Sequence, residues 1–482
     1  MAKGEIKQVV RQDAWVVVGL ASLWAVLHES TYYPFALSPA FSGSSVGEVS
    51  AYHLVYSVAL VVLFAVALLV RGRFRAQLTA SWPFACVSAG LGFLGGAALA
   101  AGDALPAVGG VIESLAVVFV AFSTAYFLLA WPAVAQSRPV ERLAALIALS
   151  YALFSVVWLV LLALPVVEAP VMACMPLVSL ACLSKAQARH VVKPSPSEAA
   201  TYKALPWNIL VLCIAFVYFG VVAVRAFTAM EQGASTLGNL DTLPHVVTAA
   251  TGLAVALALA AFFWRRSYST NALVTAVTVL TLAFVAALLA VMVLPSSGPT
   301  TIAKRVIVGI EHGYELMIFL IVVCEAARRR LSTYPMMGVY GIVVAVLPQL
   351  VSLDVMYQSG LLERLALINI VAPAAAIILF IAVAAVMMLL MRSTKQASDA
   401  ASKSNDDWQR ELCSRATQAA GLTPRELDVV LCTYRGLSAK KTAETLLVSE
   451  STVKAHLSHA YNKLGVHTKQ DLIALVDSYR EN

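Results

Sequence analysis

Apolar runs of about 20 residues recur along the first 391 residues of the chain, and no other feature constrains its fold as strongly. A helix of that length can cross the hydrocarbon core of a bilayer, which is about 30 Å thick. Twelve such runs are present, at residues 10–28, 52–70, 81–102, 109–131, 142–164, 168–184, 206–226, 245–264, 271–294, 302–326, 336–353 and 366–391. We therefore predict an all-α protein whose residues 1–391 form a polytopic membrane domain of about twelve helices.

The composition favours the same architecture. Of the 482 residues, 60% are apolar and 13% are charged, whereas a globular domain has about 45–50% and about 25%. This balance excludes a secreted disulfide-built protein and a disordered one. The charges are also unevenly distributed, because residues 398–482 carry 22 of the 61 charged side chains. A small soluble domain is therefore expected after the membrane domain.

Lysine and arginine predict the orientation of the membrane domain. With the N-terminus placed in the cytoplasm, the cytoplasmic segments of residues 1–397 hold 19 of these side chains and the outer positions hold 4. Positive loops stay on the cytoplasmic side of a membrane. We therefore predict a multi-pass protein of the cell inner (cytoplasmic) membrane with both termini in the cytoplasm.

The loop over residues 185–205 divides the predicted spans into six and six. This division around a central basic loop resembles the major facilitator superfamily of transporters in architecture only. The Gly- and Asp-containing loop of that family is not matched by residues 71–75, and the two halves show no convincing repeat. Gly92 and Gly96 form a small-xxx-small face that we interpret as a helix-packing surface.

After Met391 the chain becomes polar, and residues 392–407 are predicted to be a flexible linker. Helix signals then follow in residues 408–482. Thr423, Pro424 and Glu426 form a capping box with proline at N1. Later helices are predicted to begin at Ser438, at Ser449 and at Thr468 with Asp471, and the helix over 450–464 is expected to end at Gly465. Two of these short helices, joined by a tight turn, predict a helix-turn-helix.

The stretch from Leu422 to Val466 resembles the LuxR-type DNA-binding domain of bacterial regulators. The resemblance covers about 60 residues and is carried by Leu422-Thr-Pro-Arg-Glu, Gly436-Leu-Ser, Ala443, Leu446, Val448-Ser, Thr452-Val-Lys454, His456 and Lys463-Leu-Gly465-Val466. One departure is Thr442, where the family usually has isoleucine. The resemblance implies a four-helix domain that binds double-stranded DNA.

The resemblance also implies which residues contact DNA. The groove-facing positions correspond to Lys454, Ala455 and Ser458. Lysine can donate to guanine and alanine can contact a thymine methyl group, whereas Ser458 replaces a long basic residue of some members. The expected phosphate contacts are Thr452, Lys440, Lys441 and Lys463. The family dimerises through its fourth helix, here Thr468–Tyr479, and RNA polymerase is expected as a further partner.

Ionisable residues inside the predicted spans are candidates for a ligand site. Glu311 and Glu315 share one face of the tenth span with His312 beside them. With Arg225 and Glu113, these residues predict a cavity, open to the outside, for a small polar or aromatic molecule. The alternative is interhelical packing, which we favour for His28, Glu29, His53, Asp241 and His245.

The sequence contains no P-loop, no dinucleotide-binding glycine motif and no C-x-x-C pair. We therefore expect no enzyme activity, no cofactor and no metal. The combined features resemble twelve-helix membrane LuxR regulators. They predict a one-component transcriptional regulator that senses a small molecule through its membrane domain. The alternatives are a secondary transporter with an appended DNA-binding domain, and an adaptor whose helix-turn-helix binds protein.

Overall fold

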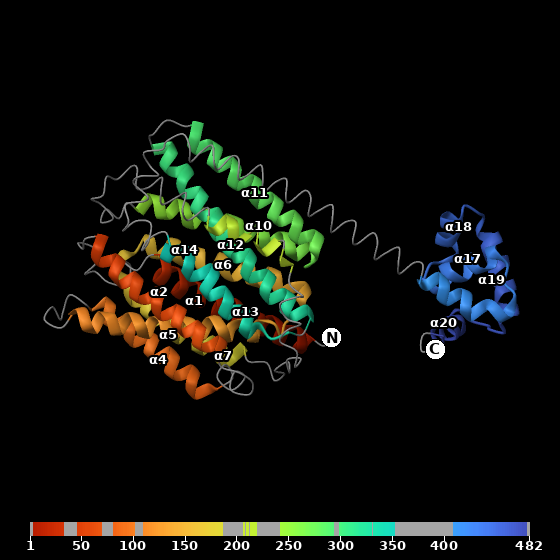
Figure 1. Ribbon diagram of the computed structural model, residues 1–482, viewed down its shortest axis with the longest axis horizontal. Helices are drawn as coiled ribbons and strands as arrows, with labels where there is room; N and C mark the ends of the chain where they lie inside the picture. Colours follow the sequence, from red (N-terminus) through yellow and green to blue (C-terminus); the bar gives the residue numbers. More distant parts are fainter. Residues whose placement is uncertain are drawn as a thin grey trace. The chain divides into compact units, whose positions relative to one another are not determined.

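The protein divides into two compact units, Met1–Val383 and Ala384–Asn482, each of which we describe by itself (Figure 1). The computed structural model describes residues 3–32, 46–69, 81–101, 109–186, 206–218 without 208 and 212, 242–293, 298–329, 331–351 and 408–479. Within these ranges every regular element is a helix and no strand occurs. The predicted all-α class is therefore confirmed for the described part of the chain.

The N-terminal unit is a bundle of long apolar helices. Its elements are α1 (Lys3–Tyr32), α2 (Val46–Leu69), α4 (Trp82–Ala100), α5 (Gly109–Ala135), α6 (Val140–Leu162), α7 (Pro165–Ala186), α10 (Thr242–Arg266), α11 (Thr270–Val293), α12 (Gly298–Arg329), α13 (Thr333–Tyr340), a π-helical turn (Gly341–Val346) and α14 (Leu347–Gln349). Residues 209–211 and 213–218 are also helical.

Six helices among the described residues are long and apolar enough to cross a membrane. They cover Trp82–Ala100, Val111–Ala135, Val140–Leu162, Val167–Ala186, His245–Arg266 and Ile302–Arg329. Five shorter apolar helices coincide with five further predicted runs, at Asp13–His28, His53–Leu69, Ile209–Tyr218, Asn271–Ala287 and Thr333–Val346. The predicted run 366–391 lies outside the described residues. The count of twelve spans therefore stays a prediction.

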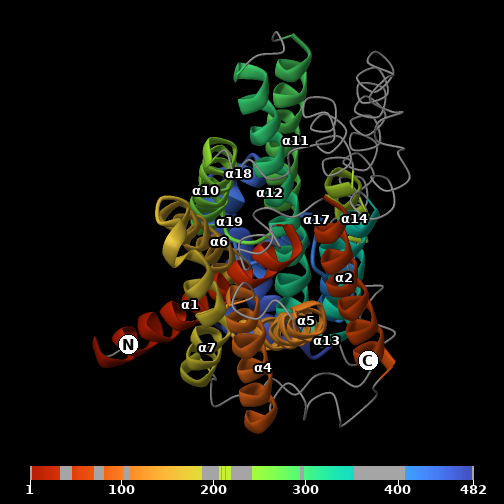
Figure 2. The ribbon, with the colours of Figure 1, turned by 90° about the vertical axis from the view of Figure 1, so that its left-hand side faces the viewer.

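Helix α12 lies at the centre of this unit. Every residue from 309 to 326 is buried, because α12 packs against α6, α10, α11 and α13, and Figure 2 shows α11 running alongside it. Two glycines allow the close approach to α10. A Cβ atom at Gly309 would lie 2.5 Å from Cβ of Thr251, and one at Gly313 would lie 2.8 Å from Cγ1 of Val255.

The glycines of α4 have the packing role that their spacing predicts. A Cβ atom at Gly92 would lie 2.4 Å from Oγ of Ser123 in α5. At Gly96 it would lie 2.9 Å from Cα of Ala173 in α7. Since the Ala173 backbone cannot retreat as a flexible side chain can, α4 fits against α7 only with hydrogen at Gly96.

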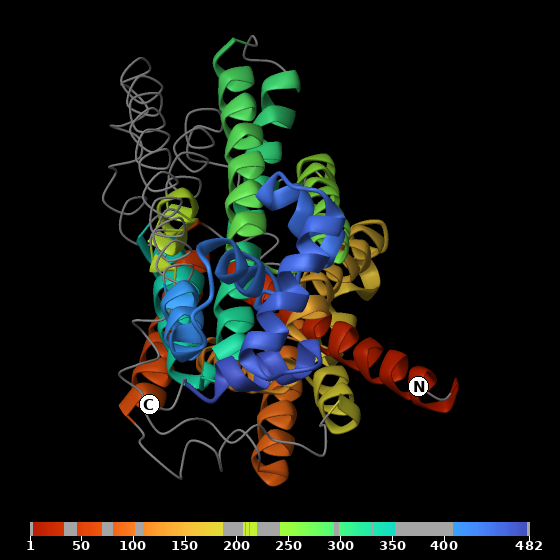
Figure 3. The same cartoon turned by 90° about the vertical axis from the view of Figure 1, so that its right-hand side faces the viewer.

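The C-terminal unit is a small helical domain (Figure 3). A helix over residues 408–417 continues as a 3₁₀ turn, Gln418–Ala420, and is followed by α17 (Pro424–Tyr434), α18 (Ala439–Leu446), α19 (Glu450–Leu464) and α20 (Lys469–Asp477). Its larger core joins the first helix with α17, α19 and α20 and contains Leu412, Cys413, Ala416, Val430, Leu431, Ala460, Val466, Leu472 and Val476.

The predicted caps begin each of these four helices. Thr423 and Glu426 form a complete capping box, and so do Thr468 and Asp471. The Ser438 and Ser449 hydroxyls accept hydrogen bonds from N–H groups in the first turns of α18 and α19. Gly465 ends α19 in the left-handed conformation with φ 66°. These local hydrogen bonds satisfy helix-terminal N–H groups and so determine where each helix begins.

Candidate nucleic-acid interface and interior polar cluster

Helices α18 and α19 form a compact pair. Only three residues, 447–449, separate the end of α18 from the start of α19, and the Val448 N–H closes the turn by donating to the Ala443 carbonyl over 3.1 Å. Ala443 and Val453 then pack with Val429 of α17 in a second small core. This core fixes the angle at which α19 is presented to solvent.

The outer face of α19 carries the predicted base-contacting residues. Lys454, Ala455 and Ser458 are all exposed and fall on one face because they are three and four residues apart. The Lys454 ammonium lies 2.7 Å from Oε1 of Glu450 on the same helix. The hydrogen bond from Lys454 and its positive charge hold the pKa of Glu450 below its usual value.

Three of the predicted phosphate contacts lie in α18 and in the first turn of α19. Lys440 and Lys441 are exposed in the first turn of α18, and Lys441 pairs with Glu444 over 3.0 Å. Thr452 is half-buried, and its hydroxyl lies 2.7 Å from Oγ of Ser449 at the cap of α19. The helix start thus orders Thr452.

Lys463, the fourth predicted phosphate contact, lies elsewhere. Nine residues of α-helix after Lys454 place it on the opposite side of α19. Its ammonium lies 2.7 Å from Oε2 of Glu426 and donates to the Gly421 carbonyl over 3.3 Å. The hydrogen bond from Lys463, followed by that from the Thr423 N–H, lowers the pKa of Glu426 to about 2. Lys463 therefore holds the end of α19 against the start of α17.

This arrangement defines a helix-turn-helix domain of the DNA-binding type. Residues 420–476 match the family of bacterial regulatory proteins of the luxR type. The C-terminal unit therefore carries a LuxR-family DNA-binding domain of transcriptional regulators.

Two kinds of relative resemble this domain. A segment of 52 residues is 48% identical to an HTH-type transcriptional regulator of Mycobacterium bovis, over 11% of this chain and 6% of that protein. A segment of 58 residues is 41% identical to the Fimbriae Z protein of Escherichia coli, over 12% of this chain and 28% of that protein. Since these shares are small, the likeness is confined to the DNA-binding domain.

The predicted ligand residues of α12 are deep inside the N-terminal unit. Glu311, His312 and Glu315 are each 1–2% exposed, and Nε2 of His312 lies 3.6 Å from Oε2 of Glu311. Arg225 lies outside the described residues. Glu113 is half-buried near the start of α5, on a different helix from these three residues. Among the described residues, no three or more His, Cys, Asp or Glu side chains are arranged so that they could hold a metal ion.

His28 of α1 joins this cluster, although its sequence context favoured simple packing. Its ring centroid lies 4.6 Å from that of His312. Two rings of α6 complete the contact, since His28 stacks on Phe154 at 4.9 Å and meets the edge of Tyr151 at 5.4 Å. No local sequence signal links His28 to His312, because the helices that carry them, α1 and α12, are far apart in the sequence.

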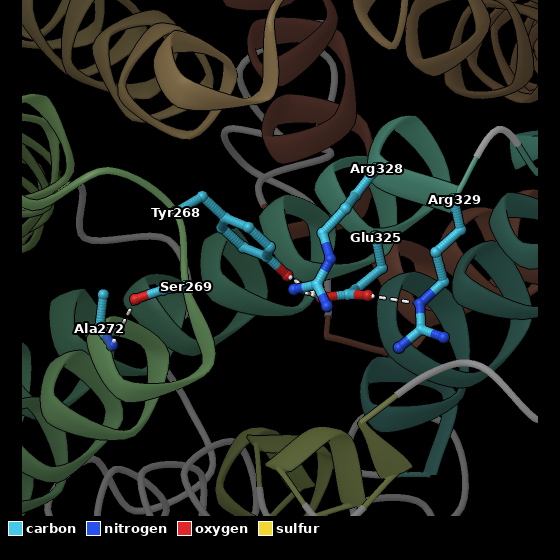
Figure 4. A network of polar contacts seen from close by, with 6 residues as sticks. All are labelled: Tyr268, Ser269, Ala272, Glu325, Arg328 and Arg329. Carbon is cyan, nitrogen blue, oxygen red and sulfur yellow. Dashed lines mark hydrogen bonds and ion pairs between the residues drawn. The ribbon is translucent and has the colours of Figure 1, made fainter. Parts of the chain in front are cut away.

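A second polar network, at the far end of α12, was missed by sequence reasoning (Figure 4). The Tyr268 hydroxyl, from the connection between α10 and α11, donates to Oε1 of Glu325 over 3.1 Å. Arg329 donates from Nε to Oε2 of the same carboxylate over 3.0 Å, and Arg328 lies 3.6 Å from Oε1. The only sequence signal was the spacing of Glu325 to Arg328 and Arg329, at i+3 and i+4. This network fastens the α10–α11 connection to the end of α12.

Proposed function

We propose that this protein is a membrane-embedded one-component transcriptional regulator. The observation that supports this proposal is the presence, in one chain, of a LuxR-family DNA-binding domain and six described helices long enough to span a bilayer. In this proposal residues 1–391 form a twelve-span sensor of the inner membrane, 392–407 a linker and 408–482 the cytoplasmic DNA-binding domain.

Lys454, Ala455 and Ser458 would contact bases, because they form the exposed face of α19. Lys440, Lys441 and Thr452 would contact phosphate beside them. Lys463 would act indirectly, by holding α19 in place through Glu426. Two domains would pair through Thr468–Tyr479, whose residues Gln470 and Ala474 remain exposed beside the buried Leu472 and Val476.

The sensing step would involve the interior cluster around Glu311, His312 and Glu315. A signal that alters the packing of α12 would change the position of the DNA-binding domains, which a short linker keeps near the membrane. Tethering raises their local concentration and so favours dimers on DNA. The ligand would be a small polar or aromatic molecule.

Chromatin immunoprecipitation of the tagged full-length protein tests the regulator. We expect a few sharp promoter peaks that vanish in a Lys454→Ala/Lys440→Ala variant. The control variant Arg415→Gln removes an exposed charge from the helix over residues 408–417 of the C-terminal unit, and not from α18 or α19. It should retain the promoter peaks. Absence of peaks in the wild-type protein under every growth condition would refute the proposal. Ligand accumulation in proteoliposomes would then support a transporter.

A further inference from the structure

Glu450 is the only acidic residue of α19, and it lies beside the predicted base contact Lys454. The side chain of Glu450 is 46% exposed, and that of Lys454, one turn further along the helix, is 66% exposed. Oε1 of Glu450 and Nζ of Lys454 are 2.7 Å apart. When α19 presents the Lys454 ammonium to a ligand, it therefore presents the Glu450 carboxyl group as well.

The Glu450 carboxyl group is ionised at neutral pH. The hydrogen bond from Lys454 and the positive charge of Lys454 are the main reasons that its pKa lies below the usual value, and the charge of Lys440 in α18 acts in the same direction. An ionised carboxylate accepts hydrogen bonds and donates none. The exposed surface of α18 and α19 thus contains a strong acceptor within electrostatic reach of a lysine on each helix.

A carboxylate on a DNA-binding surface opposes binding unless a donor faces it, because the phosphate backbone is negative. In the major groove cytosine offers such a donor, the N4 amino group, with which glutamate can pair. Adenine also donates from N6, but the N7 acceptor beside it repels a carboxylate. Guanine, the partner of cytosine, presents two acceptors to a lysine, O6 and N7. A C·G pair therefore matches an adjacent carboxylate and ammonium better than an A·T pair does.

The separation of the two charged groups also fits the edge of one base pair. Cytosine N4 and guanine O6 are joined by an N–H···O hydrogen bond, whose usual length is about 2.9–3.0 Å. Oε1 and Nζ, at 2.7 Å, are nearly the same distance apart. Oε1 can therefore accept from cytosine N4 while Nζ donates to guanine O6, without separation of the ion pair.

We propose that Glu450 is a specificity-determining residue, and that the Glu450–Lys454 pair reads one C·G base pair in the major groove. The proposal rests on the proposed function, because it requires that α19 enters the groove. At other base pairs the carboxylate meets an acceptor and opposes binding, so Glu450 selects against wrong sequences as well as for the right one.

Selection of binding sites from random double-stranded DNA by the full-length protein in detergent tests this proposal. The wild-type motif should contain a C·G pair at which Glu450→Gln and Glu450→Ala each reduce the preference by about fivefold or more. Lys454→Ala should weaken the preference at the same base pair. Glu411→Gln is the matched control, because Glu411 pairs with Arg415 four residues later over 2.9 Å, but on the helix over residues 408–417. It should keep the wild-type motif.

Binding to DNA that lacks the selected site separates base reading from a structural role. Glu450→Gln removes a negative charge close to the phosphates, so its affinity for such DNA should rise above that of the wild type. If the carboxylate only stabilised α19, its loss would weaken binding to every sequence alike.

A motif that Glu450→Gln and Glu450→Ala leave unchanged, or weaken equally at every base pair, would overturn the proposal. If Lys454→Ala still altered that motif, the proposed function would stand without it. Failure of the wild-type protein to enrich any DNA sequence would reject both the proposed function and the reading of a C·G pair.

Discussion

Replacing Leu447 by glycine or asparagine is expected to stabilise the C-terminal unit. Leu447 ends α18 with φ 54° and ψ 45°, in the left-handed region. In the described part of this unit, the other residues with positive φ are glycines, at 421, 436 and 465. Only glycine, and to a lesser degree asparagine, adopts this conformation without strain. Leucine is therefore the residue that does not fit the backbone here.

The expected change in the free energy of unfolding is the sum of two opposing contributions. A left-handed conformation costs an L-residue with a Cβ atom about 1–2 kcal/mol. Glycine removes that cost but loses about 0.5–1 kcal/mol through its greater freedom in the unfolded chain. Because the Leu447 side chain is 91% exposed, its removal sacrifices little buried surface. Leu447→Gly and Leu447→Asn should each gain about 0.5–1 kcal/mol, or roughly 2–8 °C in Tm for a domain of this size.

Thermal unfolding of residues 384–482, followed by circular dichroism, measures this effect. Leu447→Ala serves as the control, since it keeps Cβ and should stay within about 0.5 kcal/mol of the wild type. Gly465→Ala is the reverse experiment. Its φ is 66° and no atom lies within 4 Å of an added Cβ, so it should lose about 0.5–1 kcal/mol through the backbone alone. Unchanged or lower Tm values in both Leu447→Gly and Leu447→Asn would refute the reasoning.

Three further predictions concern other contacts. The low pKa of Glu426 means that its contribution to stability is present above the usual carboxyl pKa and is lost as the pH falls toward about 2. In a plot of the unfolding midpoint of residues 384–482 against pH, the Glu426→Gln variant should therefore show a shallower decline at acidic pH than the wild type. A decline equal to that of the wild type would contradict this. In the full-length protein in detergent, Gly96→Val should lower Tm, because its Cβ would meet the Ala173 backbone at 2.9 Å. Gly90→Val, on the same helix with no atom within 4 Å of its Cβ, is the control, and equal Tm values would refute the packing argument. Tyr268→Phe removes a hydrogen bond to the buried Glu325 carboxyl group and should cost about 1.5–3 kcal/mol. A thermal shift assay measures this loss, and a wild-type Tm would show that the bond contributes nothing.

The limits of α17 to α20 could be predicted because their signals are local. Each cap joins residues within one helical turn, as Thr423 and Glu426 do, so the sequence contains both partners side by side. The place of Lys463 could not be predicted in this way. A lysine in a basic stretch suggests a phosphate contact, and only the fold shows that its ammonium reaches back to Glu426 at the start of another helix.

The interior cluster, too, could be predicted from the sequence only in part. Glu311, His312 and Glu315 could be assigned to the interior because ionisable residues in an apolar run are unusual. Their partners could not be predicted, because His28, Tyr151 and Phe154 come from helices whose neighbours depend on the packing of the whole bundle. The Glu325 network was missed for a related reason. Tyr268 lies in a connection between helices, where hydrophobic periodicity carries no information.

In the proposed membrane domain, the length of α12 would make the protein sensitive to the thickness of the bilayer. Its 32 residues extend about 48 Å at 1.5 Å per residue, whereas a typical hydrocarbon core is about 30 Å thick. A helix longer than the bilayer tilts or projects, and its tilt decreases as the bilayer thickens. The depth of Glu325 and its two arginines beneath the headgroups would thus follow the acyl-chain length of the surrounding lipids. Lipid composition would then act on the same helix that carries the interior cluster.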